Sequence, residues 1–240
     1  MEDKLFDTNG PVGDFTFDSQ TANVFDDMVN RSVPLYSEIQ RMCCELATYH
    51  AKENTNLYDI GCATGTTLIR LNPEIDTSVN FIGIDNSDDM LNKAKSKLSA
   101  ESSTRNIELL NVDINSTLPT FENSSVIIML LTLQFIRPSN RSRVVKAIYD
   151  SLVPNGCFIL VEKISLPDSG LNRMFIDGYY NYKRRHGYSE LEISKKREAL
   201  ENVLIPYHHQ ENIELLNGSG FSRVAEFFRW FNFTGVVSVK

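Results

Sequence analysis

The amino-acid sequence predicts an α/β protein built on a mixed, mostly parallel sheet with helices on both faces. Short apolar stretches alternate with helical patterns between residues 56 and 163, as they do where parallel strands are joined by helices. The last stretch, 221–240, contains two apolar runs joined by a tight connection, which predicts an antiparallel pair at one edge. Together these features predict a single sheet of seven strands.

The five strands expected before that pair are short and rich in β-branched or aromatic residues. They cover 56–60, 79–84, 107–112, 124–135 and 157–163. The fourth is long for a strand, and the fifth follows a turn signal at 154–156. Residues 87–98 and 139–152 carry apolar side chains at helical spacing, and Ser87 with two acids after it suits a helix N-terminus.

We expect the 240 residues to form one domain, because a chain of this length can bury a full core. Its expected parts are an N-terminal helical cover (1–54), a nucleoside-binding core (55–164), a helical insert (165–217) and a C-terminal strand pair (218–240). Aromatic residues in the first part indicate a segment that packs on the core or covers a site.

The composition is that of an ordinary globular protein, with 42% apolar and 23% charged residues. A net charge of −7 argues against broad attachment to nucleic acid, and we interpret the densest basic stretch, YKRRHGY (182–188), as a solvated loop. The four cysteines lack metal-like spacing, which favours a reduced, cytoplasmic protein without a metal. No secretory signal and no apolar run of about 18 residues is present, so we expect no membrane attachment.

Polar residues stand where three of the expected strands end, and this predicts a nucleoside site. Gly61 and Gly65 follow the first strand and allow tight turning and close ligand approach. Asp85 follows the second strand and can accept both ribose hydroxyls, while Asp113 follows the third and can receive an adenine amino group. NAD is disfavoured because the glycine spacing is not Gly-x-Gly-x-x-Gly. Residues alone therefore predict an adenosine-like ligand.

The stretch DIGCATG (59–65) resembles the D-x-G-C/T-x-x-G shape of class I S-adenosylmethionine-dependent methyltransferases, which implies their Rossmann-like, seven-stranded fold. Longer motifs resemble one branch of that superfamily, the carboxy-S-adenosyl-L-methionine synthases. They are DFTFD (14–18), VFDDMVNRSVPLYSEI (24–39), YDIGC (58–62), IDNS (84–87), TLQF (132–135), GYSELEISKKREALENV (187–203) and FNF (231–233), in the family's order.

The resemblance implies that S-adenosylmethionine and prephenate are converted to carboxy-S-adenosylmethionine and phenylpyruvate. In that reaction the methyl group beside the sulfonium loses a proton and captures carbon dioxide released from prephenate. A separate enzyme then uses the product to modify the wobble uridine of certain tRNAs. The resemblance also implies a homodimer, with no direct nucleic acid binding.

By the same resemblance, ten positions are ligand contacts: Tyr36, Gly61, Cys62, Ala63, Asp85, Asn86, Asp113, Ile114, Leu130 and Arg197. Two of them depart from the family's pattern. Ala63 stands where serine is usual, although its backbone N–H is still available. Leu130 stands where asparagine is usual, so that contact is either absent or made by backbone.

Arg197 and Tyr36 are the expected catalytic residues, both acting on the new carboxylate of the product. Ser189 and Glu192 match a capping box at the start of the helix that carries Arg197. From spacing alone, an i,i+4 pair with Glu201 is the simpler explanation of this arginine. The resemblance and the attraction between guanidinium and carboxylate instead favour a ligand contact.

Several alternatives stay open at the level of sequence. His186 and His208 are interpreted as surface or structural residues and Cys62 as a small spacer, so no general base is assigned. Arg197 is equally compatible with a site in its own chain or in a dimer partner. The alternative functions are a small-molecule methyltransferase and a non-catalytic subunit that binds S-adenosylmethionine.

Overall fold

The computed structural model describes residues 1–7, 12–101, 105 and 107–240. Its core is a seven-stranded sheet in the order β3-β2-β1-β4-β5-β7-β6. The strands are β1 (Asn56–Ile60), β2 (Asn80–Asp85), β3 (Ile107–Asn111), β4 (Ser124–Leu130), β5 (Leu152–Lys163), β6 (Arg223–Trp230) and β7 (Phe233–Val239). The first five are parallel, and β7 pairs antiparallel with both β5 and β6. The predicted mixed sheet is therefore confirmed.

Two expected boundaries were wrong, both beside β4. The apolar run after residue 124 leaves the sheet at Leu130, because Leu131 has a left-handed φ of 61° and the chain then forms a short 3-10 helix, η1 (Leu133–Phe135). The turn expected at 154–156 lies inside β5, where Asn155 has a φ of 61° and the pairing with β4 shifts register. The apolar run after residue 124 and the turn signal at 154–156 indicate local backbone conformation. They do not indicate where hydrogen bonding between strands begins or ends.

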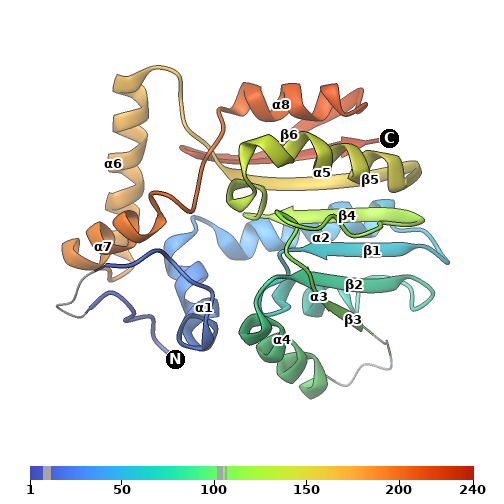
Figure 1. Ribbon diagram of the computed structural model, residues 1–240, viewed down its shortest axis with the longest axis horizontal. Helices are drawn as coiled ribbons and strands as arrows, with labels where there is room; N and C mark the ends of the chain where they lie inside the picture. The colour runs from blue at the N-terminus through green and yellow to red at the C-terminus, as the bar shows by residue number, and fades with distance from the viewer. Residues whose placement is uncertain (8–11, 102–104, 106) are drawn as a thin grey trace.

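Helices cover both faces of the sheet (Figure 1). The helices α2 (Tyr36–His50) and α3 (Thr66–Leu71) pack on one face, and α5 (Pro138–Ser151) and α8 (His209–Gly218) pack on the other. The strands alternate accordingly: Leu57 and Val126 belong to the first core, Tyr58 and Ile127 to the second. α4 (Asp88–Ala100) begins where expected, with the Ser87 side chain accepting from the Met90 N–H at 3.2 Å.

The remaining helices gather beyond the carboxyl ends of the parallel strands: α1 (Ser19–Ser32), α6 (Ser169–Arg185) and α7 (Glu190–Leu200) (Figure 1). The segment before α1 connects them to the core. The Phe15 N–H donates to the Ala199 carbonyl of α7 at 2.9 Å, and the Ser87 hydroxyl donates to the Phe17 carbonyl. Two parts distant in sequence thus close over the same edge of the sheet.

A small polar cluster holds α1 against the glycine loop that follows β1. Asp26 of α1 accepts from the Thr64 hydroxyl at 2.6 Å and pairs with Lys97 of α4 at 2.7 Å. The Lys97 ammonium also donates to the Thr66 hydroxyl at 2.8 Å. Because these groups come from three different elements, their bonds fix the position of the helical cover relative to the loop.

The stretch 182–188 is solvated only at 184–187, so its interpretation as a solvated loop was wrong for Lys183 and Tyr188. Its first residues end α6, and Lys183 and Tyr188 are both buried. The Tyr188 hydroxyl donates to Oδ2 of Asp3 at 2.6 Å, and the Arg31 guanidinium lies 4.3 Å from the Tyr188 ring centroid. Contacts with the distant N-terminal segment help to bury Tyr188, and local composition carries no sign of them.

The predicted start of α7 is confirmed. The Ser189 side chain accepts from the Glu192 N–H at 3.2 Å, and the Glu192 carboxylate accepts from the Ser189 N–H at 2.8 Å. Tyr188 and Ile193 are both buried beside this cap, in the positions of a hydrophobic staple. Cap and staple together fix the direction of a helix whose own amphipathic pattern is weak.

Replacing Ser189 with alanine is expected to lower the free energy of unfolding by about 1 kcal/mol, since an N-cap acceptor is lost while the helix stays. Urea unfolding followed by circular dichroism measures this change. Ser194→Ala is the matched control, because Ser194 is exposed in the middle of the same helix. Equal losses in the two variants would show that the cap does not stabilise α7.

Candidate active site

A cavity of about 820 Å³ opens at the carboxyl ends of the parallel strands. This volume is typical of sites for small organic ligands. All ten positions expected to contact ligand line it: Tyr36, Gly61, Cys62, Ala63, Asp85, Asn86, Asp113, Ile114, Leu130 and Arg197. The fold thus brings together residues from both ends of the chain, and their contacts with a ligand stay predictions.

The loop after β1 needs glycine at its first position. Gly61 has a φ of 75°, and a Cβ added there would collide with the Thr132 side chain. Its N–H donates to the Ile84 carbonyl at 2.7 Å, and the Cys62 N–H donates to the same oxygen at 3.0 Å. The loop is therefore bound to β2 on one side. On the other side it lies close to Thr132, in the loop that follows β4.

Asp85 is held rigidly at the end of β2. One carboxylate oxygen accepts from the Ala63 N–H at 2.9 Å and the other from the Ser87 N–H at 3.0 Å. Burial raises the pKa of Asp85, and these backbone bonds oppose that rise. Each oxygen retains a lone pair, so the fixed carboxylate suits a ligand with two adjacent hydroxyl groups. The Ala63 N–H, which was expected to be available to the ligand, already donates to Asp85.

The end of β3 combines a polar and an apolar side chain. Asp113 accepts from the Asn115 N–H at 2.9 Å, which fixes a turn and leaves one of its oxygens without a backbone donor. Ile114 is buried beside it, and Val112 also lines the cavity. A flat heterocycle with an amino group would find both an apolar surface and an acceptor here.

Tyr36 presents its hydroxyl proton to the cavity. Gln40, one turn later in α2, donates to the Tyr36 hydroxyl oxygen at 2.9 Å and to the Thr67 hydroxyl at 3.2 Å. Burial raises the pKa of Tyr36 far above its usual range, so the phenol stays protonated. Because Gln40 already supplies a donor, the tyrosine hydroxyl is free to donate to a ligand.

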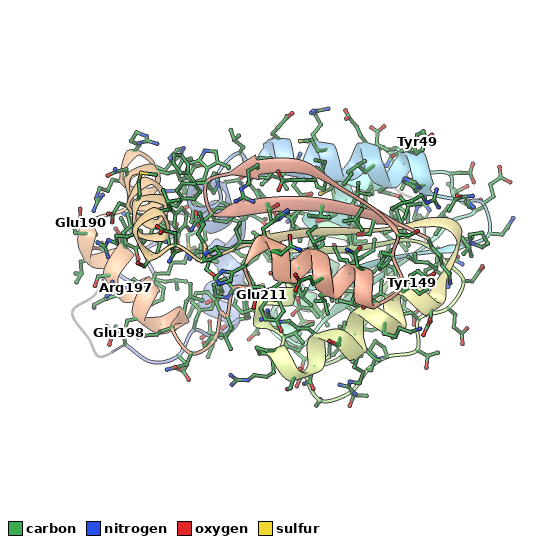
Figure 2. The ribbon with its side chains drawn as sticks, turned by 90° about the horizontal axis from the view of Figure 1, so that it is seen from above. Tyr49, Tyr149, Glu190, Arg197, Glu198 and Glu211 are labelled. Carbon is green, nitrogen blue, oxygen red and sulfur yellow. The ribbon has the colours of Figure 1, made fainter. Side chains whose placement is uncertain are left out.

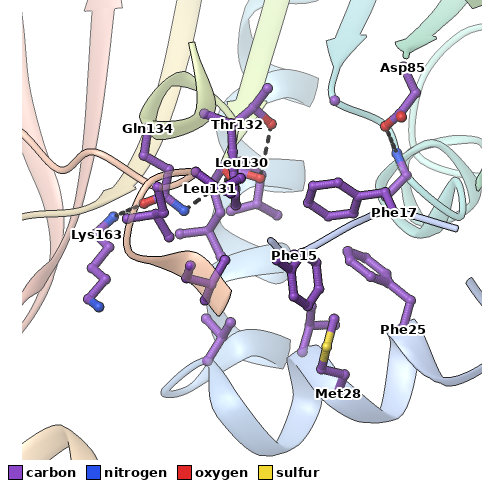
Figure 3. Close-up of a pocket in the computed structure, with 18 of the residues that line it drawn as sticks. Phe15, Phe17, Phe25, Met28, Asp85, Leu130, Leu131, Thr132, Gln134 and Lys163 are labelled. Atoms are coloured by element: carbon purple, nitrogen blue, oxygen red, sulfur yellow. Dashed lines mark hydrogen bonds between the residues drawn. The ribbon is translucent and has the colours of Figure 1, made fainter. Parts of the chain in front are cut away.

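The loop after β4 lies against the centre of the cavity (Figure 3). Leu130 lines the cavity and its carbonyl accepts from the Thr132 hydroxyl at 3.4 Å. Glu162 is buried beneath this loop, accepts from the Leu133 N–H at 2.9 Å, and has its pKa raised to about 8 by burial. At this position the protein offers an apolar side chain and backbone groups.

Aromatic residues close the cavity opposite that loop. Phe15 and Phe17 point toward the segment that carries Leu130, and Phe25 and Met28 project from α1 beneath them (Figure 3). The Phe15 and Phe17 rings stand edge to face with centroids 5.1 Å apart. The sequence indicated that the aromatics of the N-terminal part pack on the core or cover a site, and Phe15, Phe17 and Phe25 line this cavity.

Arg197 projects from α7 at one end of the molecule, on the same helix as Glu190 and Glu198 (Figure 2). Its side chain is exposed at the cavity wall. In the part of the chain that the structure describes, it makes no hydrogen bond or ion pair, so the pair expected with Glu201 is not formed. The simpler explanation of this arginine was therefore wrong.

Sequence reasoning missed three further cations of the cavity, Lys163, Lys183 and Lys196. The first ends β5 and the second sits in the basic stretch that was interpreted as solvated. A possible signal was the spacing of Lys196 from Ile193 and Ala199, two buried residues of the same helix. A buried lysine is hard to predict from sequence, because lysine side chains are usually exposed.

Neither histidine considered as a base lines the cavity. His186 lies at the end of α6 with its Nδ1 2.9 Å from the Tyr182 carbonyl, and the Nδ1 of His208 lies 3.0 Å from the Ser165 hydroxyl. Burial raises the pKa of Cys62 well above its usual range, which disfavours a thiolate. Within residues 1–7, 12–101, 105 and 107–240, no group of three His, Cys, Asp or Glu side chains is placed to hold a metal.

Comparison with known proteins decides the family. Residues 57–156 match the family model described as a methyltransferase domain. The carboxy-S-adenosyl-L-methionine synthase of Methylococcus capsulatus is 49% identical over 95% of both chains. The chain belongs to the carboxy-S-adenosyl-L-methionine synthase family. The synthase of Desulfotalea psychrophila is 43% identical over all of this chain and 97% of its own. S-adenosylmethionine dependence follows from this membership.

Solved structures confirm the fold of this synthase family member. The S-adenosylmethionine-dependent methyltransferase SibL superposes with a TM-score of 0.66 at 13% identity, covering 99% of this chain and 64% of its own. The cyclopropane synthase MmaA2 of Mycobacterium tuberculosis gives 0.57 at 16% identity, over 78% and 63%. The class I methyltransferase fold is thus confirmed. No helix of the described residues has the length and apolar character needed to cross a membrane.

Gly61→Ala is expected to weaken S-adenosylhomocysteine binding at least tenfold, because the new methyl group collides with Thr132 and the backbone is strained at a φ of 75°. Isothermal titration calorimetry measures the affinity. Gly218→Ala is the control, since a Cβ at Gly218 meets nothing within 4 Å. Affinities within twofold of each other would contradict the role given to this glycine.

Proposed function

We propose that this protein converts S-adenosylmethionine and prephenate to carboxy-S-adenosylmethionine and phenylpyruvate. The supporting observation is Arg197, an arginine on the cavity wall that has no partner among the described residues, in a chain whose family is named for that product. Every predicted nucleoside contact lines the same cavity. The ten contacts, including those of Leu130 and Ala63, are part of this proposal.

Electrostatics make Arg197 suited to the product and not to its precursor. A cation about 5 Å from a sulfonium is repelled by about 3 kcal/mol at an effective dielectric near 20. A carboxylate attached beside the sulfonium reverses the sign and can accept two parallel bonds from the guanidinium. Tyr36, whose hydroxyl oxygen already accepts from Gln40, donates a further bond to that carboxylate. Arg197 and Tyr36 thereby favour the carboxylated ligand.

The proposed reaction balances without an added oxidant or reductant. Prephenate loses carbon dioxide and hydroxide, which leaves the aromatic ring of phenylpyruvate. One C–H bond of the sulfonium methyl breaks, and its electron pair forms the new C–C bond to carbon dioxide. The released proton and hydroxide combine as water. No side chain of the cavity is assigned as the base, and a group of prephenate itself fills that role in our proposal.

We also propose the wider setting that the family resemblance implies. The protein works as a homodimer in the cytoplasm, and its product supplies a separate enzyme that modifies tRNA wobble uridine. The protein itself needs no contact with nucleic acid, which agrees with its net charge of −7.

Incubation of the purified protein with S-adenosylmethionine and prephenate is expected to yield a sulfonium species heavier by one carbon dioxide unit, together with phenylpyruvate. Mass spectrometry detects both products, and omission of prephenate should abolish them. Formation of S-adenosylhomocysteine alone would instead support the alternative, a small-molecule methyltransferase, for which apolar Leu130 is the main argument. If neither the carboxylated species nor S-adenosylhomocysteine is formed, the result would favour a non-catalytic subunit that binds S-adenosylmethionine.

Arg197→Ala should weaken the affinity for carboxy-S-adenosylmethionine at least tenfold, or about 1.4 kcal/mol, and leave S-adenosylmethionine unchanged or bound more tightly. Titration calorimetry with both ligands measures the difference. Arg197→Lys should recover only part of the loss, because an ammonium cannot make two parallel bonds. Arg185→Ala is the control, an exposed arginine outside the cavity. Equal losses for both ligands would refute the carboxylate contact.

A further inference from the structure

Three lysine side chains at one end of the cavity play no part in the steps above. Lys163 ends β5, Lys183 lies in the last turn of α6, and Lys196 lies in α7. All three line the cavity, and we call them the lysine triad. Lys183 is only 5% exposed and Lys196 only 7%. Charged side chains at this depth are almost always paired with an anion, so their partners need an explanation.

The protein supplies too few anions for the lysine triad. Among the described residues, the Nζ atoms of Lys163 and Lys183 make no hydrogen bond or ion pair. The Nζ of Lys196 also lacks a hydrogen-bond partner, and its nearest carboxylate oxygen, Oδ2 of Asp3, lies 3.9 Å away. That oxygen already accepts from the Tyr188 hydroxyl at 2.6 Å. Asp3 and Glu192 act on Lys196 and Asp3 also acts on Lys183, but among the described residues no carboxylate makes a close ion pair with any of the three ammonium groups.

Aromatic rings take the place of the missing anions only in part. The Tyr179 ring centroid lies 4.6 Å from the Nζ of Lys183 and 5.2 Å from that of Lys163. The Tyr188 ring lies 5.7 Å from the Nζ of Lys196. A ring attracts a cation less strongly than a carboxylate does, so this end of the cavity keeps an excess of positive charge.

The pKa values of the three lysines agree with an excess of positive charge at this end of the cavity. Burial lowers the pKa of Lys163 and of Lys196 to about 8. The pKa of Lys183 falls well below its usual range, first through burial and then through the charges of the other two lysines. A bound anion would reverse both causes, because it neutralises the mutual repulsion and compensates for lost hydration. The lowered pKa values thus agree with a cluster of cations that an anionic ligand would neutralise.

The position of the lysine triad separates it from the nucleoside pocket. Lys163 ends β5, which lies two strands from β1 on the side away from β2 and β3. At about 4.8 Å per strand this places it about 10 Å beyond the glycine loop. Asp85 and Asp113 lie on the opposite side of that loop, at the ends of β2 and beside β3. An anion at the lysine triad therefore lies on the side of the glycine loop away from the predicted nucleoside contacts.

We propose that the lysine triad binds the carboxylate that the second substrate keeps through the reaction, and so selects a dicarboxylate as the carbon dioxide donor. The inference rests on the proposed function. Ion pairing stabilises a carboxylate relative to neutral carbon dioxide, so the carboxylate held by the triad is protected from decarboxylation. The other carboxylate, outside those pairs, is the one released toward the sulfonium methyl. One binding site thereby determines both substrate class and the bond that breaks.

The test measures binding of phenylpyruvate, which retains only the carboxylate assigned to the triad, and the steady-state constants for both substrates. Lys183→Met and Lys196→Met keep side-chain length and remove the charge. Each should weaken phenylpyruvate binding and raise the KM for prephenate at least tenfold, with the KM for S-adenosylmethionine within twofold. Lys183→Arg should restore most of the loss. Thermal melting of the methionine variants should not fall, since an unpaired buried charge is removed.

Lys195→Met, beside Lys196 on α7 but outside the cavity lining, is the matched control and should leave these constants unchanged. If the methionine variants misfold, Lys163→Met at the half-buried end of β5 provides the same readout. A higher KM for S-adenosylmethionine alone would assign the triad to the methionine carboxylate and overturn the inference, as would unchanged phenylpyruvate binding. Failure of the proposed function looks different: the unmodified protein would form no carboxylated product, while calorimetry would still report whether the lysines bind the keto acid.

Discussion

Parallel pairing of β1 with β2 on one side and β4 on the other is the constraint on which the site depends. The register places Ile60 opposite Ile84 and Asp59 opposite Ile128, so the carboxyl ends of the three strands meet at one edge. In the loop after β1, the N–H groups of Gly61 and Cys62 both donate to the Ile84 carbonyl. The hydrogen bonding of the sheet thus continues into the loop. A slip of one residue would turn every buried side chain of β1 to the opposite face.

The other half of the cavity depends on closure by parts that do not belong to this parallel core. The N-terminal segment reaches α7 through the bond from Phe15 to Ala199, and α1 is fixed through Asp26 to the glycine loop and to α4. Because both contacts join residues far apart in sequence, the cavity forms only when the chain is folded as a whole. This arrangement buries Lys183 and Lys196 on the side on which the cations lie.

Charge is distributed unevenly along the edge of the sheet, and that asymmetry matches the proposed chemistry. Carboxylates stand at the end of β2 and after β3, whereas cations stand at the end of β5 and on α6 and α7. A sulfonium ligand with a neutral nucleoside suits the first side, and carboxylates suit the second. Arg197, exposed and without a partner in the part of the chain that the structure describes, and the lysine triad would then act on different carboxylates.

The sequence by itself determined the order of strands and helices, the capped start of α7 and the residues at the strand ends, because these follow from local periodicity, turn chemistry and family motifs. It could not determine where β4 ends, since Leu131 leaves the sheet within a continuous apolar run. Nor could it distinguish buried from solvated lysines. Tertiary structure decided that Lys183 lies inside, because burial depends on the distant segments packed around it and not on the charge of its neighbours.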